Sequence, residues 1–245
     1  MENQNPDYTY QNVIQIEDAD ASRKFLANVF LWMFVALGIS AAFAYAFSST
    51  SLITYLFEPT ATGGAQPTGL AYICMLAPLA FVLIMSFGMN RISYAGLAIL
   101  FILYSAVTGI SLSFILLAYT ASSVLGVFLT TSLVFGIMAI AGYTTKTDLT
   151  KFGSLMIMGL FGIVIASVIN IFLRSDSLGY IISYIGVAVF VGLTAYDVQK
   201  LKNIGAGIQY GEASSKKMAL MGGLTLYLDF INLFIMLLRI FGRRR

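Results

Sequence analysis

The chain has 245 residues, of which 59% are hydrophobic and 10% are charged, and it contains no histidine. Soluble domains carry about 45–50% apolar and about 25% charged residues, so this composition excludes an ordinary soluble enzyme and indicates an integral membrane protein. The absence of histidine excludes imidazole-based zinc sites, serine–histidine catalysis and haem ligation by imidazole. We therefore expect no enzymatic activity, no cofactor and no nucleic-acid partner.

Seven apolar runs are long enough to cross a bilayer, which takes about 20 mainly apolar residues. Turn signals or charged residues separate them, as at residues 144–151 and 174–177. The sequence thus predicts an all-α integral membrane protein, with a seven-transmembrane helix bundle over residues 23–245. A short, mobile polar N-terminal tail is expected over residues 1–22, which lack the basic region of a signal peptide. The runs cover residues 25–47, 70–89, 92–117, 121–143, 152–173, 178–199 and 218–239.

The distribution of lysine and arginine predicts the orientation of the bundle. With the N-terminus in the cytoplasm, the cytoplasmic segments hold nine of the 14 basic residues and the opposite side holds five. The basic residues 243–245 argue the other way, because seven full spans place them outside. We expect a cytoplasmic N-terminus on the larger count.

One carboxylate, Asp229, lies in the middle of the last apolar run, in the stretch LYLDFINLF. An Asp at the centre of a membrane helix costs about 2.5–3.5 kcal/mol on insertion scales, so such residues usually face the bundle interior or a water-filled path. Thr225 and Asn232 share its helical face at spacings of four and three residues. We expect this polar face to point inward, with Asp229 either functional or a neutral, hydrogen-bonded packing residue.

A second carboxylate, Asp197, lies near the end of the preceding run, on a helical stripe that includes Thr194. Consecutive helices run antiparallel, so Asp197 and Asp229 can meet if the sixth helix continues to about residue 202. We further expect Gly222-Gly223 to mark the start of regular helix in the last span, which would bring the two acids to similar depth.

A close carboxylate pair would share a proton and would be the best proton sensor near neutral pH in a chain without histidine. When both acids are ionised, Asp197 and Asp229 would form a weak, transient calcium site, because calcium takes six to eight oxygen ligands. Arg91, at the end of the second run, is expected on the same side as Asp197. It either forms a gating salt bridge with a carboxylate or anchors the helix at the lipid headgroups.

Four further stretches of the chain are distinctive: YSAVTGISLS at 104–113, GYTTKTDL at 142–149, TAYDVQKLKNIG at 194–205 and LTLYLDFINLFIMLLRIFG at 224–242. They resemble the bacterial branch of the Bax inhibitor-1 family, also called transmembrane Bax inhibitor motif proteins. The resemblance runs from about residue 20 to the end of the chain, and it implies a seven-helix bundle with the last helix central. It also implies a pH-sensitive calcium leak, with Asp197 and Asp229 as the proton sensor and Arg91 as their basic counterpart.

Together these features predict a calcium-permeable leak channel of the bacterial inner membrane, gated by protonation of the aspartate pair. Its partners would be the lipid bilayer and calcium as the permeant ion, and a monomer would suffice. The alternative is a non-transporting regulatory protein that modulates a membrane protease or other membrane partners, as the family resemblance also implies. An intramembrane aspartyl protease fits less well, because bulky residues 226–228 stand where its GxGD motif has glycines.

Overall fold

The computed structural model describes residues 7–59, 65–207 and 213–245, with side chains from residue 20 onward. Within these residues it contains seven α-helices, each with an apolar stretch long enough to cross a membrane, so the predicted seven-helix membrane bundle is confirmed. The elements in chain order are α1 (Asp7–Ser49), a 3₁₀ turn η1 (Ser51–Tyr55), β1 (Phe57–Pro59), β2 (Ala65–Pro67), α2 (Gly69–Gly88), α3 (Tyr94–Ala118), α4 (Ala121–Thr144), α5 (Thr150–Leu173), α6 (Asp176–Ala206) and α7 (Ala213–Phe241).

The first helix is longer than expected. It begins at Asp7, inside the segment expected to be a mobile tail, and its membrane-length part covers Asp20–Ser49. Residues 7–24 contain neither proline nor glycine, so nothing in the sequence stops the helix from continuing out of the span. Residues 1–6 of the expected tail lie outside the described residues.

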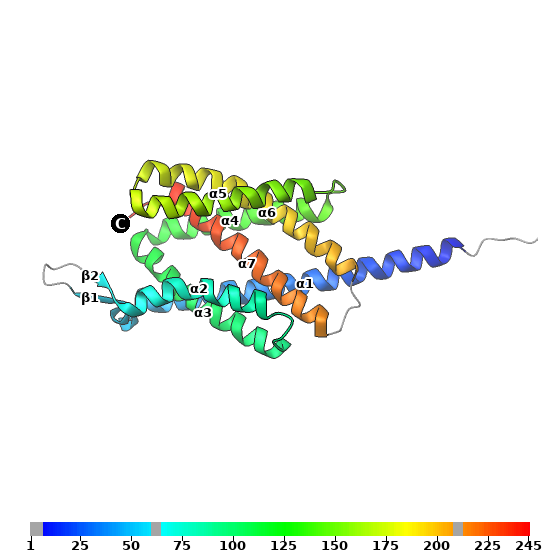
Figure 1. Cartoon of the computed structure of the whole chain (residues 1–245), viewed down its shortest axis with the longest axis horizontal. Coiled ribbons are helices and arrows are strands. Elements are labelled where there is room, and N and C mark those ends of the chain that lie inside the picture. The colour runs from blue at the N-terminus through cyan, green and yellow to red at the C-terminus, as the bar shows by residue number, and fades with distance from the viewer. Residues whose placement is uncertain (1–6, 60–64, 208–212) are drawn as a thin grey trace, which may run out of the picture.

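Helix α7 runs obliquely between two groups of helices, with α1, α2 and α3 on one side and α4, α5 and α6 on the other (Figure 1). It contacts α1, α3, α4 and α6. In the most apolar stretch of α7, as in that of α6, 56% of the residues are buried, against 17% in α2 and 6% in α5. The last helix is therefore central, as predicted; α6 shares that position, while α2 and α5 form the periphery.

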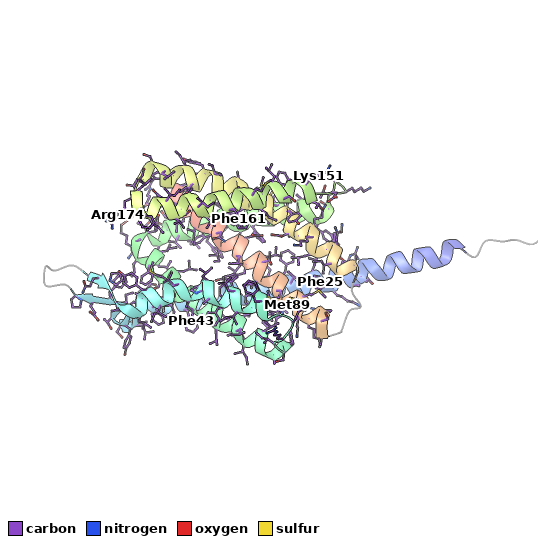
Figure 2. The ribbon with its side chains drawn as sticks, in the orientation of Figure 1. Phe25, Phe43, Met89, Lys151, Phe161 and Arg174 are labelled. Atoms are coloured by element: carbon purple, nitrogen blue, oxygen red, sulfur yellow. The ribbon has the colours of Figure 1, made fainter. Side chains whose placement is uncertain are left out.

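The loops divide between the two ends of the bundle (Figure 1). The end we call the N-terminal end carries the α2–α3 turn, the α4–α5 loop and the start of α7. The C-terminal end carries the β1–β2 hairpin, the α3–α4 and α5–α6 turns and the end of α7. Lys151 and Arg174 mark the two ends in Figure 2. The start of α1 and the end of α7 thus lie on opposite sides of the bundle, as an odd number of spans requires.

Gly222 and Gly223 lie inside α7, which begins at Ala213, so the expectation that they start the regular helix was wrong. Their role is close packing instead. A Cβ on Gly222 would lie 2.7 Å from Cδ2 of Leu201 on α6, and one on Gly223 would lie 2.6 Å from Cβ of Trp32 on α1. The glycine pair lets α1 and α6 approach α7 more closely than larger residues would allow.

Candidate functional site

The structure brings together the two acids singled out in the sequence. The carboxyl groups of Asp197 on α6 and Asp229 on α7 lie within hydrogen-bonding reach of each other. Asp229 is 5% exposed and Asp197 is half-buried. They meet because α6 and α7 pack against each other and because α6 continues to Ala206, well beyond the end of its apolar run.

The contact between the two carboxyl groups determines how many protons they hold. Two carboxylates this close in a desolvated site cannot both be ionised cheaply, so a proton shared between them would stabilise the contact. Oδ2 of Asp229 is buried and receives no hydrogen bond from any donor group of the described residues. A proton shared with Asp197 would therefore offset the cost of burying the Asp229 carboxyl group without another hydrogen-bond donor.

A cavity of about 260 Å³ lies beside the pair, toward the N-terminal end of the bundle. Its polar lining includes Asp197 and Thr225. Met89, which Figure 2 labels at the end of α2, forms part of its apolar wall. Asp197 thus stands between this cavity and the more deeply buried Asp229. The lining residues are Met89, Asp197, Lys200, Leu201, Ile204, Met218, Met221, Gly222 and Thr225.

On the other side of the pair, toward the C-terminal end, the α6–α7 interface is filled by apolar side chains. Phe190 and Leu233 are 3% and 0% exposed and belong to one hydrophobic cluster with Leu237. Met236 packs so closely on Gly186 that a Cβ there would lie 2.9 Å from its Cγ. The aspartate pair therefore lies between a partly polar cavity and closely packed apolar side chains, which we call the apolar seal.

The three supporting polar residues proposed from the sequence have different surroundings. Thr225 lines the cavity, and its hydroxyl donates to the Met221 carbonyl at 3.1 Å. Thr194 is fully buried and donates to the Phe190 carbonyl of its own helix at 2.8 Å. Asn232 is half-buried and has no hydrogen bond with any described residue. Of the three, the structure places Thr225 at the site.

Arg91 lies exposed in the turn after α2, and no described carboxylate is within ion-pair distance of it. A different cation, Lys200, faces the pair. It lines the same cavity, and its positive charge attracts the Asp197 carboxylate. Lys217 approaches from α7 and donates to the Met89 carbonyl at 3.4 Å. Lys200 was not predicted from the sequence, although its spacing of three residues from Asp197 places both on one helical face.

Comparison with known proteins identifies the family. Residues 22–245 match the family described as "Inhibitor of apoptosis-promoting Bax1". The chain belongs to this family. It is 47% identical over 223 residues to the inner membrane protein YbhL of Escherichia coli K12, which covers 90% of this chain and 92% of YbhL. It is also 44% identical over 223 residues to an uncharacterized protein of Borreliella burgdorferi (91% and 93% covered) and 38% identical over 242 residues to one of Caulobacter vibrioides (96% and 97%).

The match to the Bax1 inhibitor family spans all seven membrane helices and both aspartates, so the resemblance seen in the sequence is confirmed. One family stretch, GYTTKTDL, ends in the α4–α5 loop next to the site. Gln199, two residues beyond Asp197, fixes that loop: its Oε1 accepts from Leu149 N and its Nε2 donates to the Thr147 carbonyl, both at 2.8 Å. Only the folded structure reveals this role of Gln199, because its two partners lie 50 and 52 positions away in the sequence.

Asp148, in the same loop, is an acid outside the site. Its Oδ1 accepts from N and Oγ1 of Thr150, the first residue of α5, at 2.9 and 2.6 Å. These hydrogen bonds stabilise the ionised form and lower the pKa of Asp148. Asp148 is thus an exposed, ionised acid that offers a matched control for the buried pair.

Proposed function

We propose that this protein is a calcium-permeable leak channel of the bacterial inner membrane, opened and closed by the proton that Asp197 and Asp229 share. The observation that carries the proposal is the contact of the buried Asp229 with the half-buried Asp197, between a partly polar cavity and an apolar seal. The inner membrane is supported by the name of the E. coli relative, and the cytoplasmic N-terminus by the lysine and arginine count.

The sign of the pH dependence follows from the contact. Without the shared proton, two carboxylates about 4 Å apart repel by about 4 kcal/mol at an effective dielectric constant of about 20. That repulsion favours separation of α6 and α7 beside the cavity. The closed state therefore binds one more proton than the separated state, so lower pH stabilises it and calcium flux rises as the pH rises.

The separated pair is the proposed transient site for the permeant ion. Two ionised carboxylates are hard oxygen ligands, and water or backbone carbonyls would complete the six to eight oxygens that calcium takes. No cluster of three or more acidic, cysteine or histidine side chains that could hold a metal occurs in the described residues. A two-acid site binds calcium weakly, which suits passage through the protein better than storage. We propose a monomer with no resident cofactor as the functional unit.

We propose transport rather than proteolysis for the pair. A protease with two membrane aspartates must admit the backbone of a substrate between them. Leu226 and Tyr227, which precede Asp229 on α7, are both 0% exposed and fill the surrounding core. The cavity beside the pair is lined by Asp197 and not by Asp229, so it does not open onto both acids.

Lys200→Gln is expected to move the midpoint of the pH dependence of flux upward by about half a pH unit. The positive charge of Lys200 favours the ionised form of Asp197, and its exposed position limits the effect. Flux measured against pH in proteoliposomes checks this shift. Arg91→Gln is the matched variant, and we expect it to leave the midpoint unchanged. A larger shift with Arg91→Gln than with Lys200→Gln would show that Arg91 forms the gating salt bridge.

The proposed function is tested with purified protein in liposomes that contain a calcium-sensitive dye, over a range of about pH 6 to 8. Liposomes without protein serve as the control. We expect calcium entry above this control that increases with pH. If the protein carries no calcium at any pH, the leak is refuted and the regulatory alternative, with a membrane protease or another membrane protein as partner, takes its place.

A further inference from the structure

The C-terminal residues 243–245 form a short extended segment that is fixed on the turn between α3 and α4. Thr120 N donates to the Arg243 carbonyl, and Arg245 N donates to the Ala118 carbonyl, both at 3.0 Å. These bonds make residues 243–245 part of the folded bundle. Three consecutive arginines are thereby held at a defined place at the C-terminal end.

Tyr119 and Gly242 shape the same contact. Tyr119 pairs with Arg244 as an isolated β-bridge, and a hydrogen bond to Tyr119 raises the pKa of Arg244. Gly242 allows the chain to pass close to the ring, because a Cβ there would lie 2.6 Å from Cδ1 of Tyr119. Arg244 is thus engaged within the protein, whereas the Arg243 side chain is exposed and makes no ion pair with a described residue.

The C-terminal end of the bundle carries a strong excess of positive charge. The described side-chain carboxylates at this end are Glu58 and Asp176. All the basic residues there are arginines, whose planar guanidinium groups match the geometry of phosphate. This charge runs against the orientation that the remaining loops favour, so it calls for a separate explanation. The arginines are Arg174 (Figure 2), Arg239, Arg243, Arg244 and Arg245.

A groove of about 420 Å³ lies between α4 and α7 directly below this segment. It extends along α4 from Ser123 to Thr130, a length of about 10 Å at 1.5 Å per residue. Gly126 leaves its floor open, since nothing lies within 4 Å of a Cβ built there. Leu237 and Phe241 form the wall on the side of α7, and Phe241 is 64% exposed.

Ser123 joins the groove to the arginine segment. Its Oγ accepts from Arg243 N and from Oγ1 of Thr120, both at 3.1 Å. With both acceptor positions used, the hydroxyl proton of Ser123 has no acceptor among the described residues. The mouth of the groove therefore presents a hydroxyl donor, and it lies next to the backbone of Arg243, whose side chain is exposed.

We propose that this groove binds one acyl chain of an anionic phospholipid, with the lipid phosphate on the Ser123 hydroxyl and Arg243. The groove lies along the membrane-length helices α4 and α7, where acyl chains would be the surrounding medium, and Ser123 at its mouth lies close to the start of α4, so we expect the mouth at headgroup level. The arginine cluster favours a net negative headgroup over a zwitterionic one. A soluble anion would use the mouth and leave the apolar groove empty. This site is independent of the aspartate pair.

Native mass spectrometry of the purified full chain tests the site, with phosphatidylglycerol and phosphatidylcholine of identical acyl chains as probes. We expect one phosphatidylglycerol to bind about fivefold more tightly than phosphatidylcholine. Gly126→Leu fills the groove without a clash and should abolish this preference, and Arg243→Gln should reduce it severalfold. Gly162→Leu on α5, where a Cβ also meets nothing within 4 Å, and Lys151→Gln at the N-terminal end should both retain it.

Equal binding of the two lipids would overturn the proposal. So would a preference that survives Gly126→Leu, because that result would mean attraction by surface charge without a seated acyl chain. A preference lost equally in Gly126→Leu and in Gly162→Leu would also contradict the site, since it would show a general effect of a larger side chain in a membrane helix.

Discussion

Asp229→Asn is expected to remove the pH dependence of calcium flux. An asparagine side chain cannot release a proton in this range, so the contact with Asp197 no longer turns into repulsion as the pH rises. A single shared proton can change the balance of closed and open states by up to about tenfold per pH unit. We expect the ratio of flux at about pH 8 to flux at about pH 6 to fall from severalfold to about one.

The controls separate the pair from a general effect of lost charge. Asp197→Asn should flatten the profile in the same way, because either partner is needed for the shared proton. Asp148→Asn removes an exposed acid of the α4–α5 loop and should leave the pH profile of the wild type intact. Retention of the full pH dependence in Asp229→Asn would show that another group senses protons.

Gly142→Leu is expected to have the largest effect on folding. Gly142 on α4 packs against the backbone of Ala195 on α6, and a Cβ there would lie 2.8 Å from the Ala195 carbonyl carbon. Backbone atoms of a packed helix cannot rotate away as a side chain can, so α4 and α6 would have to separate. We expect a loss of about 3 kcal/mol in the free energy of unfolding, seen as a lower thermal midpoint in detergent or as failure to purify a monodisperse protein.

Gly136→Leu is the matched control on the same helix. A Cβ on Gly136 meets nothing within 4 Å, so leucine can extend into open space or lipid. Its thermal midpoint should stay close to that of the wild type. If both variants lose stability to the same extent, helix propensity or membrane insertion, and not contact with Ala195, controls the result.

The seven spans could be predicted because each is an apolar run of membrane length bounded by charge or turn residues. The helix ends could not be predicted by the same means. The end of an apolar run indicates where the chain leaves the lipid. Helices α1, α6 and α7 continue beyond that point through polar residues, because no proline stops them there. Gly222 and Gly223 show the limit of local signals. A glycine pair was expected to start the helix, but both residues lie inside α7, where they allow close contact with α1 and α6.

The two acids of the site could also be predicted, because an acid within an apolar run needs a partner or a proton. Their surroundings depend on which helices pack together. Lys200 shares a helical face with Asp197, yet only the cavity formed with α2 and α7 shows that it faces the pair. The role of Gln199 likewise depends on a residue far away in the chain, and so does the groove between α4 and α7, where Ser123 contacts Arg243. No spacing rule predicts such contacts.

The central claim is that Asp197 and Asp229 share a proton whose release opens the path, and infrared spectroscopy of the reconstituted protein tests it most directly. We predict a carbonyl band of a protonated carboxylic acid that is present at about pH 6, decreases toward about pH 8 together with the rise in calcium flux, and is absent in Asp229→Asn. If no such band responds to pH in the wild type, or if Asp229→Asn leaves it unchanged, the shared proton and the gating built on it are contradicted.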